Sequence, residues 1–130
     1  MIDCPCGSKN KYDQCCEPYL TKTQYPKTPE ALMRSRYTAY TLANIDYIKK
    51  TMRGPALFGF DEEDAKRWAA RVTWMGLKVF QASSEKPTQN KGYVEFEAKF
   101  MENYDLKSIH EKSEFIREKN RWYYVDGTQL

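Results

Sequence analysis

The sequence is poor in the residues that form most nucleophile–base pairs. It contains a single histidine, His110, and only four cysteines, which all lie between Cys4 and Cys16. With one imidazole and no cysteine elsewhere, we expect neither a Ser–His–Asp nor a Cys–His catalytic arrangement. We interpret His110, which lies in a predicted strand, as a solvated or structural side chain.

Long apolar runs and a strong net charge are also missing. No apolar run approaches the roughly 18 residues that a membrane-spanning helix needs. The net charge is +3, from 21 basic and 18 acidic side chains, which gives no strong field for nucleic acid or anionic lipid. The first residues show no basic region followed by an apolar segment, so no export signal is predicted. We therefore expect a cytoplasmic protein without a membrane partner.

The four cysteines form two close pairs near the start of the chain. Cys4 and Cys6 flank a proline, and Cys15 and Cys16 are adjacent. Four thiolates suit the tetrahedral coordination of Zn²⁺, and a closed shell of four protein ligands is typical of a structural site. We predict that these four residues bind one structural Zn²⁺ in a small knuckle, residues 1–20.

Two other interpretations of the cysteines remain open. Disulfides need an oxidising compartment, which the missing export signal does not favour. A redox-active dithiol could use Cys4 and Cys6, but it leaves the adjacent Cys15 and Cys16 unexplained. The metal is therefore favoured. Because about twenty residues cannot bury enough core to fold alone, we expect the ion to supply most of the folding free energy of the knuckle.

The next part of the chain predicts a linker and three helices. Residues 17–26 contain two prolines and several polar side chains, and we expect them to be extended, with the linker proper at 21–27. Helices are predicted at 28–40, 45–52 and 61–71, with Gly54-Pro55 as a break. Their predicted N-caps are Thr28, Asn44 and Asp61.

From residue 72 the apolar period changes to two. This alternation predicts strands at 73–80, 93–100, 107–118 and 121–126, with a polar loop at 83–92 and a bulge at Gly76. Helices followed by consecutive antiparallel strands indicate an α+β fold, in which about three helices pack on a curved four-stranded antiparallel sheet.

The concave face of such a sheet can enclose a pocket beneath the first helix. In the third strand Glu111 and Ser113 share a face with apolar neighbours, and the last strand offers a similar set. The candidate pocket residues are Arg34, Arg36, Tyr37, Glu111, Ser113, Trp122, Tyr124 and Asp126. A carboxylate in an aromatic pocket has a raised pKa, so Glu111 or Asp126 could act as a general base.

A structural role for the same residues is favoured. Glu111 is then paired with Arg34 or Arg36 as a buried ion pair. Trp74, Trp122 and Tyr124 fill the interior, so the expected pocket is closed or shallow.

Two parts of the chain resemble known families. The run Cys4-Pro5-Cys6-Gly7-Ser8, the segment 9–12 and the closing Cys15-Cys16 resemble the SEC-C motif, the zinc-binding tail best known from the SecA translocase. The glycine that this family has after the serine is absent here. Segments 25–40, 109–115 and 121–127 resemble YchJ-like (UPF0225) proteins.

The resemblance implies a SEC-C motif at residues 1–20 followed in the sequence by an NTF2-like (cystatin-like) cone at residues 28–130. It also implies membership of a largely uncharacterised family. By analogy with SEC-C contacts to chaperone and ribosome partners, it implies a non-enzymatic interaction module whose knuckle docks on a protein. NTF2-like sheets often dimerise, so a homodimer is a further expectation.

Two other functions compete with docking. In one, the cone binds or transforms a small ligand, with Glu111 or Asp126 as acid or base. In the other, the knuckle contacts RNA. Residues 1–27 carry four lysines against three carboxylates, and a tetrathiolate site adds a formal charge of about −2. RNA binding ranks last because it needs a basic surface.

Overall fold

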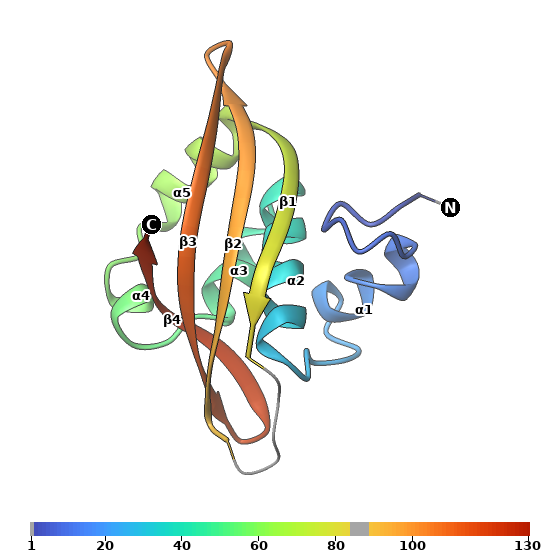
Figure 1. Ribbon diagram of the computed structural model, residues 1–130, viewed down its shortest axis with the longest axis vertical. Helices are drawn as coiled ribbons and strands as arrows, with labels where there is room; N and C mark the ends of the chain where they lie inside the picture. The colour runs from blue at the N-terminus through green and yellow to red at the C-terminus, as the bar shows by residue number, and fades with distance from the viewer. Residues whose placement is uncertain (1, 84–88) are drawn as a thin grey trace.

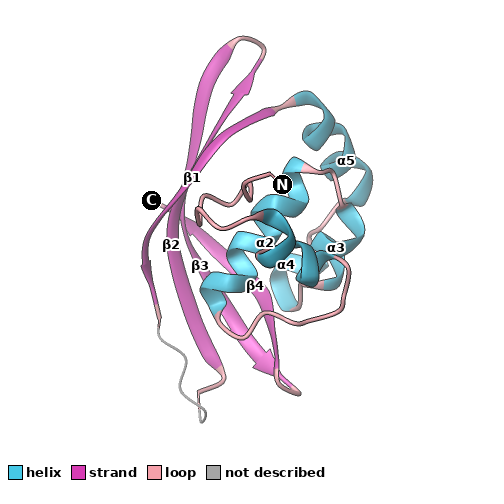
Figure 2. Ribbon diagram, turned by 90° about the vertical axis from the view of Figure 1, so that its right-hand side faces the viewer, coloured by secondary structure: helices cyan, strands magenta, loops and turns pink. Residues whose placement is uncertain are grey.

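A single antiparallel sheet forms the framework of the chain. The computed structural model describes residues 2–83 and 89–130. The strands β1 (Thr73–Ala82), β2 (Lys91–Glu102), β3 (Asp105–Glu118) and β4 (Arg121–Gln129) lie side by side in chain order. The sheet curves around a layer of helices that covers one face (Figure 2). The predicted α+β cone is confirmed.

The helices precede the sheet in the sequence. They are η1 (Tyr12–Gln14), α1 (Glu17–Leu20), α2 (Pro29–Thr41), α3 (Ile45–Lys50), α4 (Gly54–Phe58) and α5 (Glu62–Arg71). The helix α2 lies between the N-terminal segment and the sheet, and the N-terminal segment lies on the β1 side of the molecule (Figure 1). None of the helices in the described chain is long and apolar enough to cross a membrane.

The predicted caps fix where the three longer predicted helices begin. The Thr28 hydroxyl accepts a hydrogen bond from the Ala31 N–H at 3.0 Å. The side-chain oxygens of Asn44 and Asp61 accept from the backbone N–H groups three residues ahead, at 3.1 and 3.0 Å. Each cap satisfies a backbone donor that has no partner within its helix.

Two short helices were not expected from the sequence. Residues 17–20 were predicted to be extended, but the Cys16 carbonyl accepts hydrogen bonds from the N–H groups of Tyr19 and Leu20 and starts α1. Gly54-Pro55 was predicted to be only a break, but Pro55 lies in the first turn of α4. Proline is well tolerated there, because its missing N–H would have no partner in the helix.

The strands extend further than the alternation indicated. The bulge at Gly76 is confirmed, and further register shifts occur between Val79 and Gln81 and between Glu114 and Phe115. The loop predicted at 83–92 is shorter, since β2 begins at Lys91, and residues 84–88 of it lie outside the described chain. The strand β4 continues to Gln129, three residues beyond its predicted end.

The core between α2 and the sheet is apolar and aromatic. Buried side chains of α2, β2, β3 and β4 form one cluster. At its edge the Trp74 ring lies 5.2 Å from the Trp68 ring and 5.5 Å from the Phe100 ring, measured between centroids. Trp68 therefore anchors α5 on the sheet.

We predict that Gly92→Ala destabilises the fold where β2 passes the start of α2. A Cβ at this position would lie 2.8 Å from the Ser83 hydroxyl oxygen and would overlap the Pro29 ring. Overpacking of this kind costs about 1–3 kcal/mol, which urea unfolding would measure. The control is Gly59→Ala, whose Cβ would meet its nearest neighbour at 3.7 Å. Equal unfolding free energies for the two variants would contradict the prediction.

Candidate functional site

The four cysteines converge on one point. Their Sγ atoms all lie within 4.8 Å of one another, with Cys6 and Cys15 at 3.6 Å and Cys15 and Cys16 at 4.0 Å. All four are free thiols, so the disulfide interpretation does not fit this geometry. Sulfur atoms at the corners of a tetrahedral Zn²⁺ shell lie about 3.8 Å apart. The donor set therefore fits a single four-coordinate ion.

Hydroxyl groups orient the sulfur atoms. The Thr38 hydroxyl, on α2, donates to Cys16 Sγ at 3.3 Å and lies 3.8 Å from Cys4 Sγ. The Ser8 hydroxyl lies 3.1 Å from Cys15 Sγ. Such donors fix ligand geometry in metal sites and stabilise the charge on thiolates. Thr38 was not predicted from the sequence, because nothing local links it to a motif 22 residues away.

The electrostatics of the cluster also suit a cation. Hydrogen bonding from the Cys16 thiol lowers the pKa of Cys6 to about 4, and the same contact raises the pKa of Cys16. Burial raises the pKa of Cys15 to about 11. The lowered pKa of Cys6 favours its thiolate, whereas the raised pKa values of Cys15 and Cys16 keep these thiols protonated until a cation binds.

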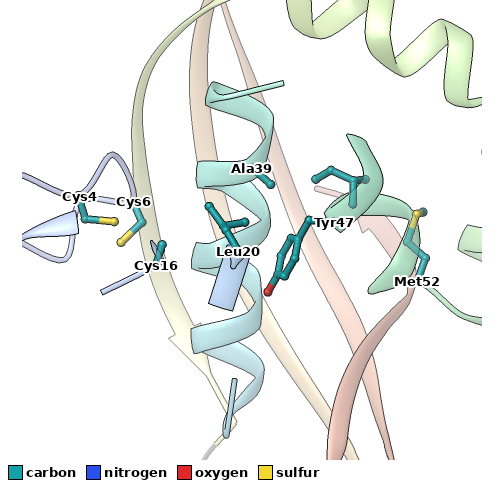
Figure 3. Packing of buried hydrophobic residues seen from close by; sticks show 8 residues of the cluster. Cys4, Cys6, Cys16, Leu20, Ala39, Tyr47 and Met52 are labelled. Carbon is teal, nitrogen blue, oxygen red and sulfur yellow. The ribbon is translucent and has the colours of Figure 1, made fainter. Parts of the chain in front are cut away.

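The knuckle is built into the core of the molecule. Cys4, Cys6 and Cys16 are 5%, 0% and 1% exposed and belong to one buried cluster with residues of α1, α2 and α3. Figure 3 shows this cluster extending from the cysteines past α2 to Met52. Arg34, also on α2, donates from Nη1 to the Cys6 carbonyl at 2.7 Å. The cysteine site and the helix layer therefore form one packed unit.

Comparison with known proteins identifies the family. A family model described as the middle NTF2-like domain of YchJ matches residues 28–127. The chain belongs to the YchJ (UPF0225) family. It is similar to a UPF0225 protein of Geobacter sulfurreducens, with 39% identity over 124 residues that cover 95% of this chain and 77% of the relative.

Two solved structures support both parts of the resemblance. A SEC-C motif containing protein from Rhodopseudomonas palustris is 37% identical, has a TM-score of 0.89, and matches over 99% of each chain. A SEC-C motif containing protein from Psychrobacter arcticus is 30% identical with a TM-score of 0.82, over 100% of this chain and 84% of that one. The YchJ fold and the SEC-C resemblance predicted from the sequence are confirmed.

The cone contains a second candidate site. A cavity of about 180 Å³ lies between α2 and the sheet. Five of the eight predicted pocket residues line it, namely Arg36, Tyr37, Glu111, Ser113 and Tyr124. We expected a closed or shallow pocket filled by Trp74, Trp122 and Tyr124, but Trp74 and Tyr124 line this cavity instead of filling it.

The other three predicted pocket residues lie elsewhere. Arg34 extends from α2 toward the knuckle, where its Nη1 donates to the Cys6 carbonyl. Trp122 is 3% exposed in the apolar core, and its indole Nε1–H donates to the Lys27 carbonyl at 3.2 Å. Asp126 is exposed in a separate open groove and accepts from the Gly127 N–H. Alternation along β4 did not reveal the register shift that separates Tyr124 from Asp126.

Glu111 has neutral partners in the cone. Its Oε2 accepts from the Ser113 hydroxyl at 2.5 Å and the Tyr124 hydroxyl at 3.1 Å, and its Oε1 accepts from Gln129 Nε2 at 3.0 Å. Burial, followed by the nearby Glu111 carboxylate, raises the pKa of Tyr124. Gln129 was missed because β4 was predicted to end at residue 126.

The expected ion pair of Glu111 with Arg34 or Arg36 is wrong. Arg34 pairs with Glu30. Arg36 donates to the Ile48 carbonyl and to the Thr51 hydroxyl. His110 lies on the outer face, with Nε2 2.8 Å from Glu95 Oε2, which agrees with a structural or solvated role.

We predict that Arg34→Met weakens the attachment of the knuckle to α2. The variant keeps most of the aliphatic stem but leaves the Cys6 carbonyl without its 2.7 Å donor, which costs about 1–3 kcal/mol for a buried group. Arg67→Met is the matched control, because the Arg67–Asp64 pair is 62% and 73% exposed and such pairs contribute about 0–1 kcal/mol. Urea unfolding of both variants would measure how much unfolding free energy each one loses. A loss for Arg34→Met no greater than the loss for Arg67→Met would contradict the prediction.

Proposed function

We propose that this protein is a non-enzymatic zinc-binding module whose knuckle docks on a protein partner. The observation that carries the proposal is the single cluster of four thiols, closed on its inner side by α2. Soft thiolate ligands in a tetrahedral set favour Zn²⁺ over hard cations. Four protein ligands leave no open coordination position, so the ion would hold the knuckle in shape and would activate no water.

The outer surface of the knuckle is exposed and held rigidly. Asp3 and Lys11 form an isolated antiparallel bridge, and their side chains pair at 2.7 Å. The Tyr12 N–H donates to the Ile2 carbonyl at 3.0 Å, and the Ile2 side chain is 68% exposed. A preformed surface loses little conformational entropy on binding. An exposed aliphatic side chain surrounded by polar groups suits a small protein contact.

A protein suits this surface better than RNA does. Of the two lysines in the knuckle, Lys11 is paired with Asp3, and Lys9 is the one basic side chain among residues 2–20 without an ion pair. Phosphate binding depends on several unpaired cations acting together.

The four free thiols favour action in the reducing cytoplasm, where thiols persist.

The metal prediction concerns zinc content and stability. We expect the purified protein to contain about one zinc per chain, with a shell of four sulfur ligands at about 2.3 Å in X-ray absorption. Cys6→Ser should lose most of the zinc and lower the melting temperature by several degrees, because metal binding contributes to folding. Ser108→Ala, at an exposed position of β3, should change neither quantity. Full zinc content in Cys6→Ser would contradict this assignment.

The docking prediction requires variants that keep the metal. We expect Ile2→Asp and Lys9→Glu to retain zinc and melting temperature but to weaken recovery of the partner in affinity capture from lysate. Phe58→Asp, at a 96% exposed position of α4, is the control and should capture the partner normally. Capture that is unaffected by the knuckle variants would refute docking through this surface. Recovery of a second copy of this chain would assign the surface to self-association instead.

A further inference from the structure

Arg36 is a buried cation that forms no ion pair with the part of the chain that the structure describes. Its side chain, on α2, is 8% exposed, and no carboxylate of the described chain lies within 4.0 Å of its guanidinium. Nη1 donates to the Ile48 carbonyl at 2.8 Å and to the Thr51 hydroxyl at 2.7 Å. The guanidinium carbon lies 4.7 Å from the centroid of the Tyr124 ring. Buried arginines are usually paired with an acid, so this arrangement needs an explanation.

The Arg36 side chain lines the cavity in the cone. Its Nη1 makes the two hydrogen bonds above, and its Nε and Nη2 have no hydrogen-bond partner among residues 2–83 and 89–130. Within the same residues, the fully enclosed polar side-chain atom without a partner is Trp74 Nε1, and Trp74 lines this cavity too. Unpaired donors in an apolar enclosure favour an oxygen acceptor.

Charge around the cavity determines what kind of acceptor fits. Glu111 lines the same cavity and already accepts three hydrogen bonds, so it adds negative charge without needing a donor. Beside the cavity lies an open groove of about 460 Å³, which shares four lining residues with it. The described lining of this groove includes Asp61, Asp64 and Asp126 but no lysine or arginine. The acidic lining of this groove, together with the Glu111 carboxylate, disfavours the binding of an anion in the cavity.

The remaining walls limit the size and polarity of the ligand. Met33, Phe96, Ala98, Ile109 and Phe115 give the cavity an apolar lining. Its volume of about 180 Å³ is below the roughly 300–1,000 Å³ of sites for drug-sized ligands. We propose that the cone binds a small uncharged carbonyl compound with an apolar body, such as a carboxamide, whose oxygen accepts hydrogen bonds from Arg36. This site is independent of the docking surface on the knuckle.

Three probes of nearly equal shape test the charge of the ligand. Benzamide is neutral, benzoate is its anionic counterpart and benzylamine its cationic one. Each would be titrated into ¹⁵N-labelled wild-type protein while the Nε–H resonance of Arg36 and the indole N–H resonance of Trp74 are followed. We expect benzamide to shift both resonances and to bind at least about tenfold more tightly than either charged probe, a difference of about 1.4 kcal/mol.

Two outcomes of this titration would overturn the proposal. If none of the probes shifts these resonances at about 10 mM, a concentration sufficient for ligands of this size, the cavity holds only water. If benzoate binds as tightly as benzamide or more tightly, the site is an anion site. Both outcomes are read from the wild-type protein, so they do not depend on whether a variant folds.

A cavity-filling variant locates the bound probe. Ala98 is 3% exposed and lines the cavity, so Ala98→Leu should abolish benzamide binding without removing any polar group. The control is Ala70→Leu, at an exposed position of α5, which should bind benzamide as the wild type does. Unchanged binding in a folded Ala98→Leu protein would place benzamide elsewhere and refute the assignment.

Discussion

The structure depends on the burial of three cysteines against one helix. Cys4, Cys6 and Cys16 have almost no exposed surface, and Thr38 and Arg34 of α2 contact the thiols and the backbone that carries them. Because these hydroxyl and guanidinium donors come from α2, the helix stabilises the arrangement of the knuckle. The geometry of the thiol cluster and the position of α2 are therefore coupled.

The same helix serves two sites on opposite sides. Arg34 and Thr38 are four residues apart and point to the knuckle, whereas Arg36 and Tyr40, also four apart, point to the cone. A spacing of four residues keeps side chains on one face of a helix. The two arginines therefore have different roles although only one residue separates them, and a sequence motif that contains both does not tell them apart.

Local patterns predicted most of the fold and the entire thiol set. The spacing of Cys4, Cys6, Cys15 and Cys16 needs no tertiary information, and the alternation in β2 and β3 placed Glu111 and Ser113 correctly on the inner face. The caps Thr28, Asn44 and Asp61 were visible for the same reason. The prediction failed where distant segments decide the outcome. The partners of Arg34 and Arg36 depend on packing. The register shift in β4 moved Asp126 away from the cavity, and Trp122 is buried in the core instead of lining the cavity. Prolines that begin short helices were interpreted as breaks or as part of an extended linker.

The contact between Trp122 and the Lys27 carbonyl joins residues 95 positions apart, and this has a consequence for synthesis on the ribosome. The knuckle and α2 leave the exit tunnel before any strand does, and their mutual contacts lie within the first 41 residues. The cone, in contrast, is completed by β4, the last strand to be made. Domains generally fold as their segments emerge, so the thiol cluster can assemble against α2 while the other face of that helix is still bare. The four thiols can thus come together before the interior of the cone is enclosed.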